Sequence, residues 1–180
     1  MQNSPQAGRP PGVDRRSFLK AGAAAAIAIS GTALINAREA WGLETKSLSP
    51  ETMRTLIVLA RDIYPHDRLA DRFYAIAVKG WDEKSAGNAA TKEMVVAGVL
   101  VLDANAKAAH GVGYADVAWE EDRVALLRPM SEGAFFQAVR SDLISSLYNQ
   151  HEIWPLFGYE GESASKGGYI HRGFNDLDWL

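Results

Sequence analysis

Apolar side chains recur at three- and four-residue spacing along most of the chain after residue 48, which is the period of an amphipathic α-helix. The motif Ser49-Pro50-Glu51 places a serine as N-cap and a proline in the first helical turn. Leu48 is positioned to pack on Met53 as a hydrophobic staple. A buried stripe follows, and Pro65 ends it: Met53, Leu56, Ile57, Ala60, Ile63, Tyr64. We therefore predict a helix over residues 50–64.

A second and a third helix are predicted from the next two apolar stripes. The second begins near Asp67, and Gly80 with residues 82–88 is interpreted as the loop that follows it. The third covers residues 91–109, where Gly98 would allow close helix contact and Gly111 is the expected C-cap. The predicted inward positions are Leu69, Phe73, Ile76 and Ala77 in the second helix, and Met94, Val95, Val99, Leu102 and Ala106 in the third.

Two further segments complete the predicted helical domain, residues 38–153. Residues 114–128 form a shorter fourth segment that Pro129 ends, and Ser131 is the expected cap of a fifth helix reaching about residue 148. Their predicted buried positions are Val117, Val124 and Leu127, then Phe135, Val139, Leu143 and Leu147. No useful alternating pattern of a β-strand occurs, so the predicted fold class is all-α, a small bundle of about five helices.

The last segment, residues 154–180, has a different composition. It is too rich in glycine and proline for a helix and too aromatic for disorder, so we expect an irregular but ordered tail within the same domain. Its aromatic side chains either pack on their own bundle or face another subunit, because aromatic residues and arginine dominate protein interfaces. The candidate interface residues are Trp154, Phe157, Tyr159, Tyr169, His171, Arg172, Phe174 and Trp179.

Residues 1–37 are interpreted as an export signal. A polar stretch leads into Asp14-Arg15-Arg16-Ser17-Phe18-Leu19-Lys20 and a weakly apolar run from Ala21 to Ile35. This order resembles a twin-arginine export signal, in which Arg15, Arg16, Phe18, Leu19 and Lys20 are the expected signal residues. The alternative is an amphipathic N-terminal helix packed on the domain. Export would place the chain in the periplasm, and an uncleaved signal would tether it to the membrane.

Composition narrows the possible chemistry. The 180 residues carry a formal charge of −3, which excludes a strongly basic nucleic-acid binder, and the absence of cysteine excludes thiolate metal sites, iron–sulfur clusters and c-type haem attachment. The histidines lie in separate segments without a paired metal motif, and no nucleophile elbow or dinucleotide loop occurs. Asp62 and Asp67 flank Pro65, and helix capping with solvation explains them. We therefore expect no catalytic, cofactor-binding or metal-binding residue in this chain.

Two segments together resemble the gluconate 2-dehydrogenase subunit 3 family. The C-terminal part of the resemblance is WPLFGYEG at residues 154–161, KGGY at 166–169 and FNDLDW at 174–179. The second part is LARDIYPHD at residues 59–67, which is similar to the family's segment after the first helix. The resemblance covers residues 48–180 and is specific in the tail.

The resemblance implies a non-catalytic small subunit of a periplasmic or membrane-associated sugar or sugar-acid dehydrogenase. Its partner would be a flavoprotein of the glucose–methanol–choline (GMC) type that holds FAD, and the small subunit would supply export and stability. Electrons commonly leave such complexes through a cytochrome c, which would add haem c in a third subunit. The alternative is a secreted carbohydrate-binding or stand-alone helical interaction module, with Trp154, Tyr159 and Trp179 as stacking platforms.

Overall fold

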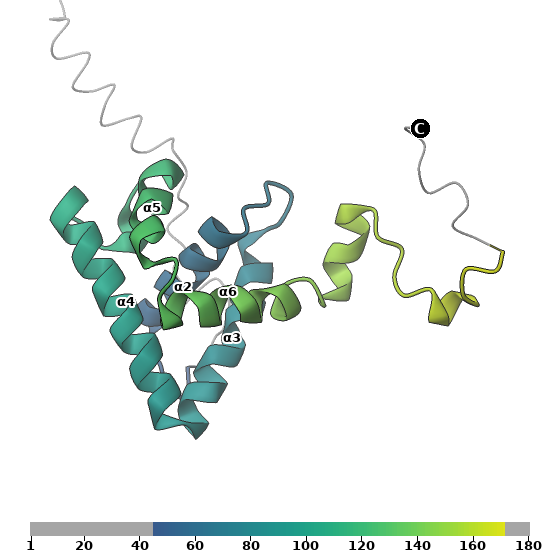
Figure 1. Cartoon of the computed structure of the whole chain (residues 1–180), viewed down its shortest axis with the longest axis horizontal. Coiled ribbons are helices and arrows are strands. Elements are labelled where there is room, and N and C mark those ends of the chain that lie inside the picture. The colour runs from purple at the N-terminus through teal and green to yellow at the C-terminus, as the bar shows by residue number, and fades with distance from the viewer. Residues whose placement is uncertain (1–44, 172–180) are drawn as a thin grey trace, which may run out of the picture. The chain divides into compact units, whose positions relative to one another are not determined.

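The computed structural model describes residues 45–171, within which every regular element is a helix and no residue forms a strand (Figure 1). The α-helices are α2 (Pro50–Ile63), α3 (Asp71–Gly87), α4 (Ala89–His110), α5 (Glu120–Leu127) and α6 (Ala134–Ser146). The 3-10 helices are η1 (Tyr114–Asp116), η2 (Arg128–Met130), η3 (His151–Phe157) and η4 (Ala164–Lys166). The predicted all-α bundle is confirmed.

Helix α2 begins as the sequence predicts and lies at the centre of the bundle. The Ser49 side chain accepts a hydrogen bond from the Thr52 N–H at 3.1 Å, and Leu48 and Met53 are both buried, as a hydrophobic staple requires. The helix contacts α3, α4, α5 and α6. Most of the predicted stripe is buried, but Ile63 and Tyr64 at its end are only partly covered.

Helix α3 differs from its prediction at both ends. It starts at Asp71 and continues through Gly80 to Gly87, so the loop predicted for residues 82–88 is wrong. The extension is stabilised because the Trp81 ring is buried and the Asp82 carboxylate is buried with hydrogen-bond partners. Of the predicted buried positions, Leu69, Phe73 and Ala77 are buried, but Ile76 is 52% exposed.

Helix α4 follows α3 after a single residue, Asn88, whose side chain accepts a hydrogen bond from the Thr91 N–H at 3.1 Å. Its predicted inward positions are buried apart from Met94, which is partly covered. The expected close contact at Gly98 is present, because a Cβ there would overlap the ring of Phe135 on α6. Gly111 caps the helix in the left-handed conformation, with φ of +77°. Figure 1 shows α6 crossing both α3 and α4.

The chain between α4 and α6 is more broken than predicted. Residues 114–128 form η1 and then the short helix α5, rather than one continuous segment. Ser131 does not cap α6: its hydroxyl donates to the Arg128 carbonyl at 2.9 Å within the turn that Pro129 starts, and Gly133 is the N-cap. The predicted buried face of α6 is correct at all its positions, namely Phe135, Val139, Leu143 and Leu147.

One carboxylate holds the chain that enters the bundle. Asp82, 4% exposed, accepts hydrogen bonds from the backbone N–H groups of Lys46, Ser47 and Leu48 at 2.6, 2.9 and 2.7 Å. Burial alone would raise the pKa of Asp82, but these three hydrogen bonds outweigh it and lower the pKa below its ordinary value. The segment before α2 is therefore fixed to the second half of α3.

Candidate partner interface

The sequence-predicted interface residues fall into two groups in the structure. Trp154, Phe157, Tyr159, Tyr169 and His171 lie among the described residues, whereas Arg172, Phe174 and Trp179 lie outside them. The predicted export residues Arg15, Arg16, Phe18, Leu19 and Lys20 also lie outside the described residues. The candidate interface is therefore built from the segment that begins with η3.

Trp154 anchors this segment to the end of the bundle. Its indole Nε1 donates a hydrogen bond to the Tyr148 carbonyl at 2.8 Å, and its ring lies 4.0 Å from the His151 ring, centroid to centroid. Tyr159 packs edge-on to the same indole at 5.2 Å, and its N–H donates to the Trp154 carbonyl at 2.9 Å. Gly161 adopts φ of +98° and passes close to the indole, where a side chain would be strained.

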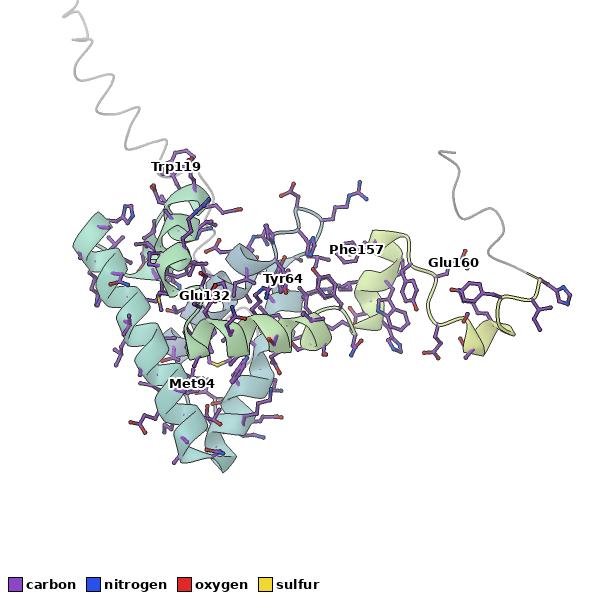
Figure 2. The ribbon with its side chains drawn as sticks, in the orientation of Figure 1. Tyr64, Met94, Trp119, Glu132, Phe157 and Glu160 are labelled. Carbon is purple, nitrogen blue, oxygen red and sulfur yellow. The ribbon has the colours of Figure 1, made fainter. Side chains whose placement is uncertain are left out.

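Phe157 connects the same segment to the loop after α2. Its ring lies edge-on to the His66 ring at 4.9 Å and lies 6.0 Å from the Tyr148 ring, centroid to centroid. Figure 2 labels Phe157 and Tyr64 in the region where the C-terminal segment meets the rest of the bundle. His66 Nε2 and the Tyr148 hydroxyl are hydrogen-bonded at 2.7 Å. The Tyr64 and Tyr148 rings also meet edge-to-face at 5.8 Å. The two segments that carry the family resemblance are thus in contact.

This contact shifts the acid–base behaviour of both hydrogen-bonded side chains. Burial lowers the pKa of His66, and the nearby Asp67 charge only partly opposes the effect. Burial also raises the pKa of Tyr148, with a smaller contribution from Tyr64. At neutral pH both groups are therefore uncharged, which suits a cluster of aromatic rings.

Much of the apolar surface of the C-terminal segment remains open to water. Phe157 is 44% exposed and Ile170 is 76% exposed, and the large side chains exposed in the same way are Leu156, Tyr159 and Tyr169. Side chains of this size are ordinarily buried in a folded domain or an interface. The tail therefore packs on its own bundle at Trp154, and several of its apolar side chains are exposed.

An open pocket of about 450 Å³ lies within this segment. His151, Trp154 and Tyr159 supply aromatic walls, and Glu160 and Lys166, which pair at 3.2 Å, supply charge. Within residues 45–171 no group of three or more histidine, aspartate or glutamate side chains is arranged to hold a metal ion. The pocket offers aromatic stacking surfaces and one ion pair.

The buried polar centre of the bundle was not anticipated from the sequence. Asp62 is buried rather than solvated, which corrects the interpretation that capping and solvation explain it. Its carboxylate accepts hydrogen bonds from Arg123 Nε at 2.7 Å and Nη2 at 2.9 Å, and from the Tyr114 hydroxyl at 2.5 Å. Arg123 Nη1 also donates to the Val117 carbonyl at 2.9 Å.

The hydrogen bonds and the mutual attraction of Asp62 and Arg123 stabilise the buried charge of Arg123. Burial would lower the pKa of Arg123, but its hydrogen bonds and charge interaction with Asp62 outweigh burial and raise it. Burial and then the Asp62 carboxylate raise the pKa of Tyr114 above its ordinary value. A usable sequence signal did exist: Asp62 and Arg123 each share a helix face with a buried leucine, Leu59 and Leu127 respectively. Each nitrogen of the Arg123 guanidinium and each oxygen of the Asp62 carboxylate has at least one hydrogen-bond partner.

No helix among residues 45–171 is both long enough and apolar enough to cross a membrane. No protein-family model, curated protein or solved structure matches this chain.

Proposed function

We propose that this chain is the non-catalytic small subunit of an exported, FAD-dependent sugar or sugar-acid dehydrogenase complex of the GMC type. In this role it escorts the flavoprotein through the twin-arginine route and stabilises it in the periplasm or at the membrane. The observation that carries the proposal is the C-terminal segment, which is anchored at Trp154 yet exposes Phe157, Tyr159 and Tyr169.

The anchoring favours a preformed docking surface. The Trp154 hydrogen bond and the contacts of Phe157 with His66 fix the backbone of the segment before any partner binds. Rigid aromatic side chains lose little conformational entropy on binding, so each contributes strongly when it enters a pocket of the partner. Exposed apolar side chains gathered in one segment are typical of a surface that another protein covers.

Under this proposal, FAD belongs to the partner flavoprotein, and haem c, where electrons leave through a cytochrome, belongs to a third subunit. This chain contributes the export address and the contacts that keep the flavoprotein folded.

The test is purification of the affinity-tagged full chain from its native host. We expect a flavoprotein to co-purify in a fixed ratio, with flavin absorbance and sugar-dependent reduction of a dye. Replacing Arg15 and Arg16 by lysine is expected to leave that flavoprotein in the cytoplasm. A chain that purifies without flavin, or a flavoprotein that is exported and active without this chain, would contradict the proposal.

Variants of similarly exposed residues test whether the C-terminal segment contacts the flavoprotein. Phe157→Ser and Tyr159→Ser remove exposed rings from the C-terminal segment and are expected to lower the flavin content of the purified complex. Ile76→Ser removes an equally exposed apolar side chain from α3 and is expected to change nothing, because that residue lies outside the proposed interface. Equal flavin content in all three variants would show that the segment serves only the chain itself.

The open pocket favours a second candidate, a secreted carbohydrate-binding module. Trp154 and Tyr159 line it, and aromatic faces are surfaces on which sugar rings stack. Isothermal titration of the purified chain with mono- and oligosaccharides separates the two candidates. Heat of binding that disappears in Tyr159→Ala supports the module, whereas no heat with any sugar removes it.

A further inference from the structure

Helix α4 is apolar on the side that faces away from the bundle as well as on the side that faces it. The inward side buries Val95, Val99, Leu102 and Ala106. On the opposite side Leu100 is 62% exposed and Val101 is 51% exposed. Figure 1 shows α4 at one edge of the bundle, where its outer side meets no other described helix.

The outward residues form a single straight row along the helix. Their spacing of four, three, four and three residues keeps them on one face, and they are Glu93, Ala97, Leu100, Ala104 and Lys107. All five are exposed. The row has an acidic end, an apolar middle with two small residues, and a basic end. It spans about 21 Å along the helix axis.

We propose that this row is a self-association surface, on which α4 packs antiparallel against α4 of a second copy of this chain. The two-fold axis passes beside Leu100, at the middle of the row. Alanines on either side of that leucine let the two helices approach to roughly 8–10 Å, the ordinary spacing of packed helices. Each Leu100 then fills the space beside the partner's alanines. This inference is independent of the proposed flavoprotein partner and concerns a different face of the chain.

The charges of the row select a second copy as the occupant. Glu93 precedes Leu100 by seven residues and Lys107 follows it by seven, so an antiparallel pairing centred on Leu100 places each glutamate opposite the partner's lysine. Two equivalent attractive pairs result, one at each end. Among residues 45–171 neither side chain has an ion pair or a hydrogen bond of its own, so both are available. A parallel pairing would instead place like charges together, which favours the antiparallel arrangement.

The size of the row sets the strength of the association. A single helix-to-helix contact of this length buries less than the area typical of stable protein dimers, so we expect a dimer that forms reversibly as concentration rises. Its assembly is then read most directly by sedimentation velocity across a wide range of protein concentration. Higher salt weakens the two end pairs and is expected to shift the equilibrium toward monomer.

The test is a charge-exchange experiment on the full chain. Glu93→Lys and Lys107→Glu each convert both attractive pairs into repulsive ones, and each is expected to weaken the dimer about tenfold. The double variant Glu93→Lys/Lys107→Glu restores two attractive pairs with reversed polarity and is expected to dimerise like the original chain. Because all of these positions are exposed, the variants leave the core unchanged, which circular dichroism verifies.

Further variants distinguish a second copy of this chain from other binding partners of the row. Leu100→Glu places two like charges at the axis and is expected to abolish the dimer, whereas Ile76→Glu adds the same charge at a similarly exposed position on α3 and is expected to leave it intact. A chain that stays monomeric at all concentrations overturns the proposal. So does a double variant no better than the single ones, because another protein or a lipid surface on this row would not respond to the exchange.

Discussion

The guanidinium group of Arg123 and the carboxylate of Asp62 form a two-point ion pair in the core, Nε to Oδ2 at 2.7 Å and Nη2 to Oδ1 at 2.9 Å. The side chains are 9% and 0% exposed, and they join α5 to α2. The Tyr114 hydroxyl also donates a hydrogen bond to the Asp62 carboxylate, and backbone carbonyls accept hydrogen bonds from Arg123 Nη1. Helix α5 has only eight residues, and Arg123 is one of its two buried residues.

Removing one side of this pair is expected to destabilise the fold severely. Arg123→Met leaves the Asp62 carboxylate buried without its counter-ion, which costs about 3–5 kcal/mol of the free energy of unfolding. Urea denaturation followed by circular dichroism measures the loss. Tyr114→Phe removes a single hydrogen bond to the same carboxylate and is expected to cost about 1–2 kcal/mol.

A surface ion pair supplies the control for that prediction. Arg72 and Glu152 lie 3.4 Å apart with side chains 54% and 71% exposed, so Arg72→Met is expected to change stability by no more than about 0.5 kcal/mol. Equal losses for Arg72→Met and Arg123→Met would show that the buried pair has no special role in stability.

The carboxylate of Asp82 makes stability depend on pH. Its pKa is lower in the folded chain than the ordinary 3.8, so the stabilisation is fully present above that value and is lost as pH falls through the folded pKa. Asp82→Asn places an amide against three N–H donors and is expected to cost about 1–3 kcal/mol at pH 7. Denaturation curves at pH 7 and pH 3 should show the difference between the two proteins shrinking at the lower pH. A difference that is independent of pH would contradict this assignment.

The contact between α4 and α6 predicts an unusual response to alanine. Gly98→Ala raises helix propensity, yet its new Cβ would overlap the Phe135 ring, so we expect a net loss of about 1–3 kcal/mol. Gly80→Ala is the matched control, because nothing lies near a Cβ at that position of α3 and the substitution is expected to add about 0.5–1 kcal/mol. Combining Gly98→Ala with Phe135→Leu is expected to recover part of the loss, and thermal unfolding of the four proteins measures it.

The contact between His66 and Phe157 predicts a shifted titration. Burial lowers the pKa of His66, so its imidazole is expected to titrate below 6.5 in a nuclear magnetic resonance experiment. Phe157→Ala uncovers one side of the ring and is expected to move the pKa back toward 6.5. The sign for stability follows: because the folded chain resists protonation of His66, this group lowers stability as pH falls below 6.5. An unchanged midpoint in Phe157→Ala would show that Phe157 does not cover the imidazole in solution.

Local patterns predicted the parts of the fold that depend on local physics. The Ser49 cap, the α2 stripe and the buried face of α6 follow from spacing along one helix, and the structure confirms them. The glycine at position 98 indicated close helix contact because glycine is the smallest residue, and Phe135 fills that space. These features require no knowledge of which helices meet.

The errors arise where distant segments meet. Residues 82–88 have the composition of a loop, but Asp82 is buried because it accepts hydrogen bonds from residues 46–48, which no local pattern shows. The sequence predicts a solvated Asp62 for the same reason, because its partner Arg123 lies 61 positions further along the chain. The C-terminal candidates were identified from composition alone, and the sequence did not show that Phe157 would pack on His66.

The attachment of residues 46–48 to Asp82 also decides how the bundle responds to mechanical tension. A pull on Lys46 acts first on three hydrogen bonds that converge on one carboxylate of α3, because residues 46–48 precede the first turn of α2. Tension applied to Lys46 is therefore transmitted to the last turns of α3 before it reaches the capped end of α2.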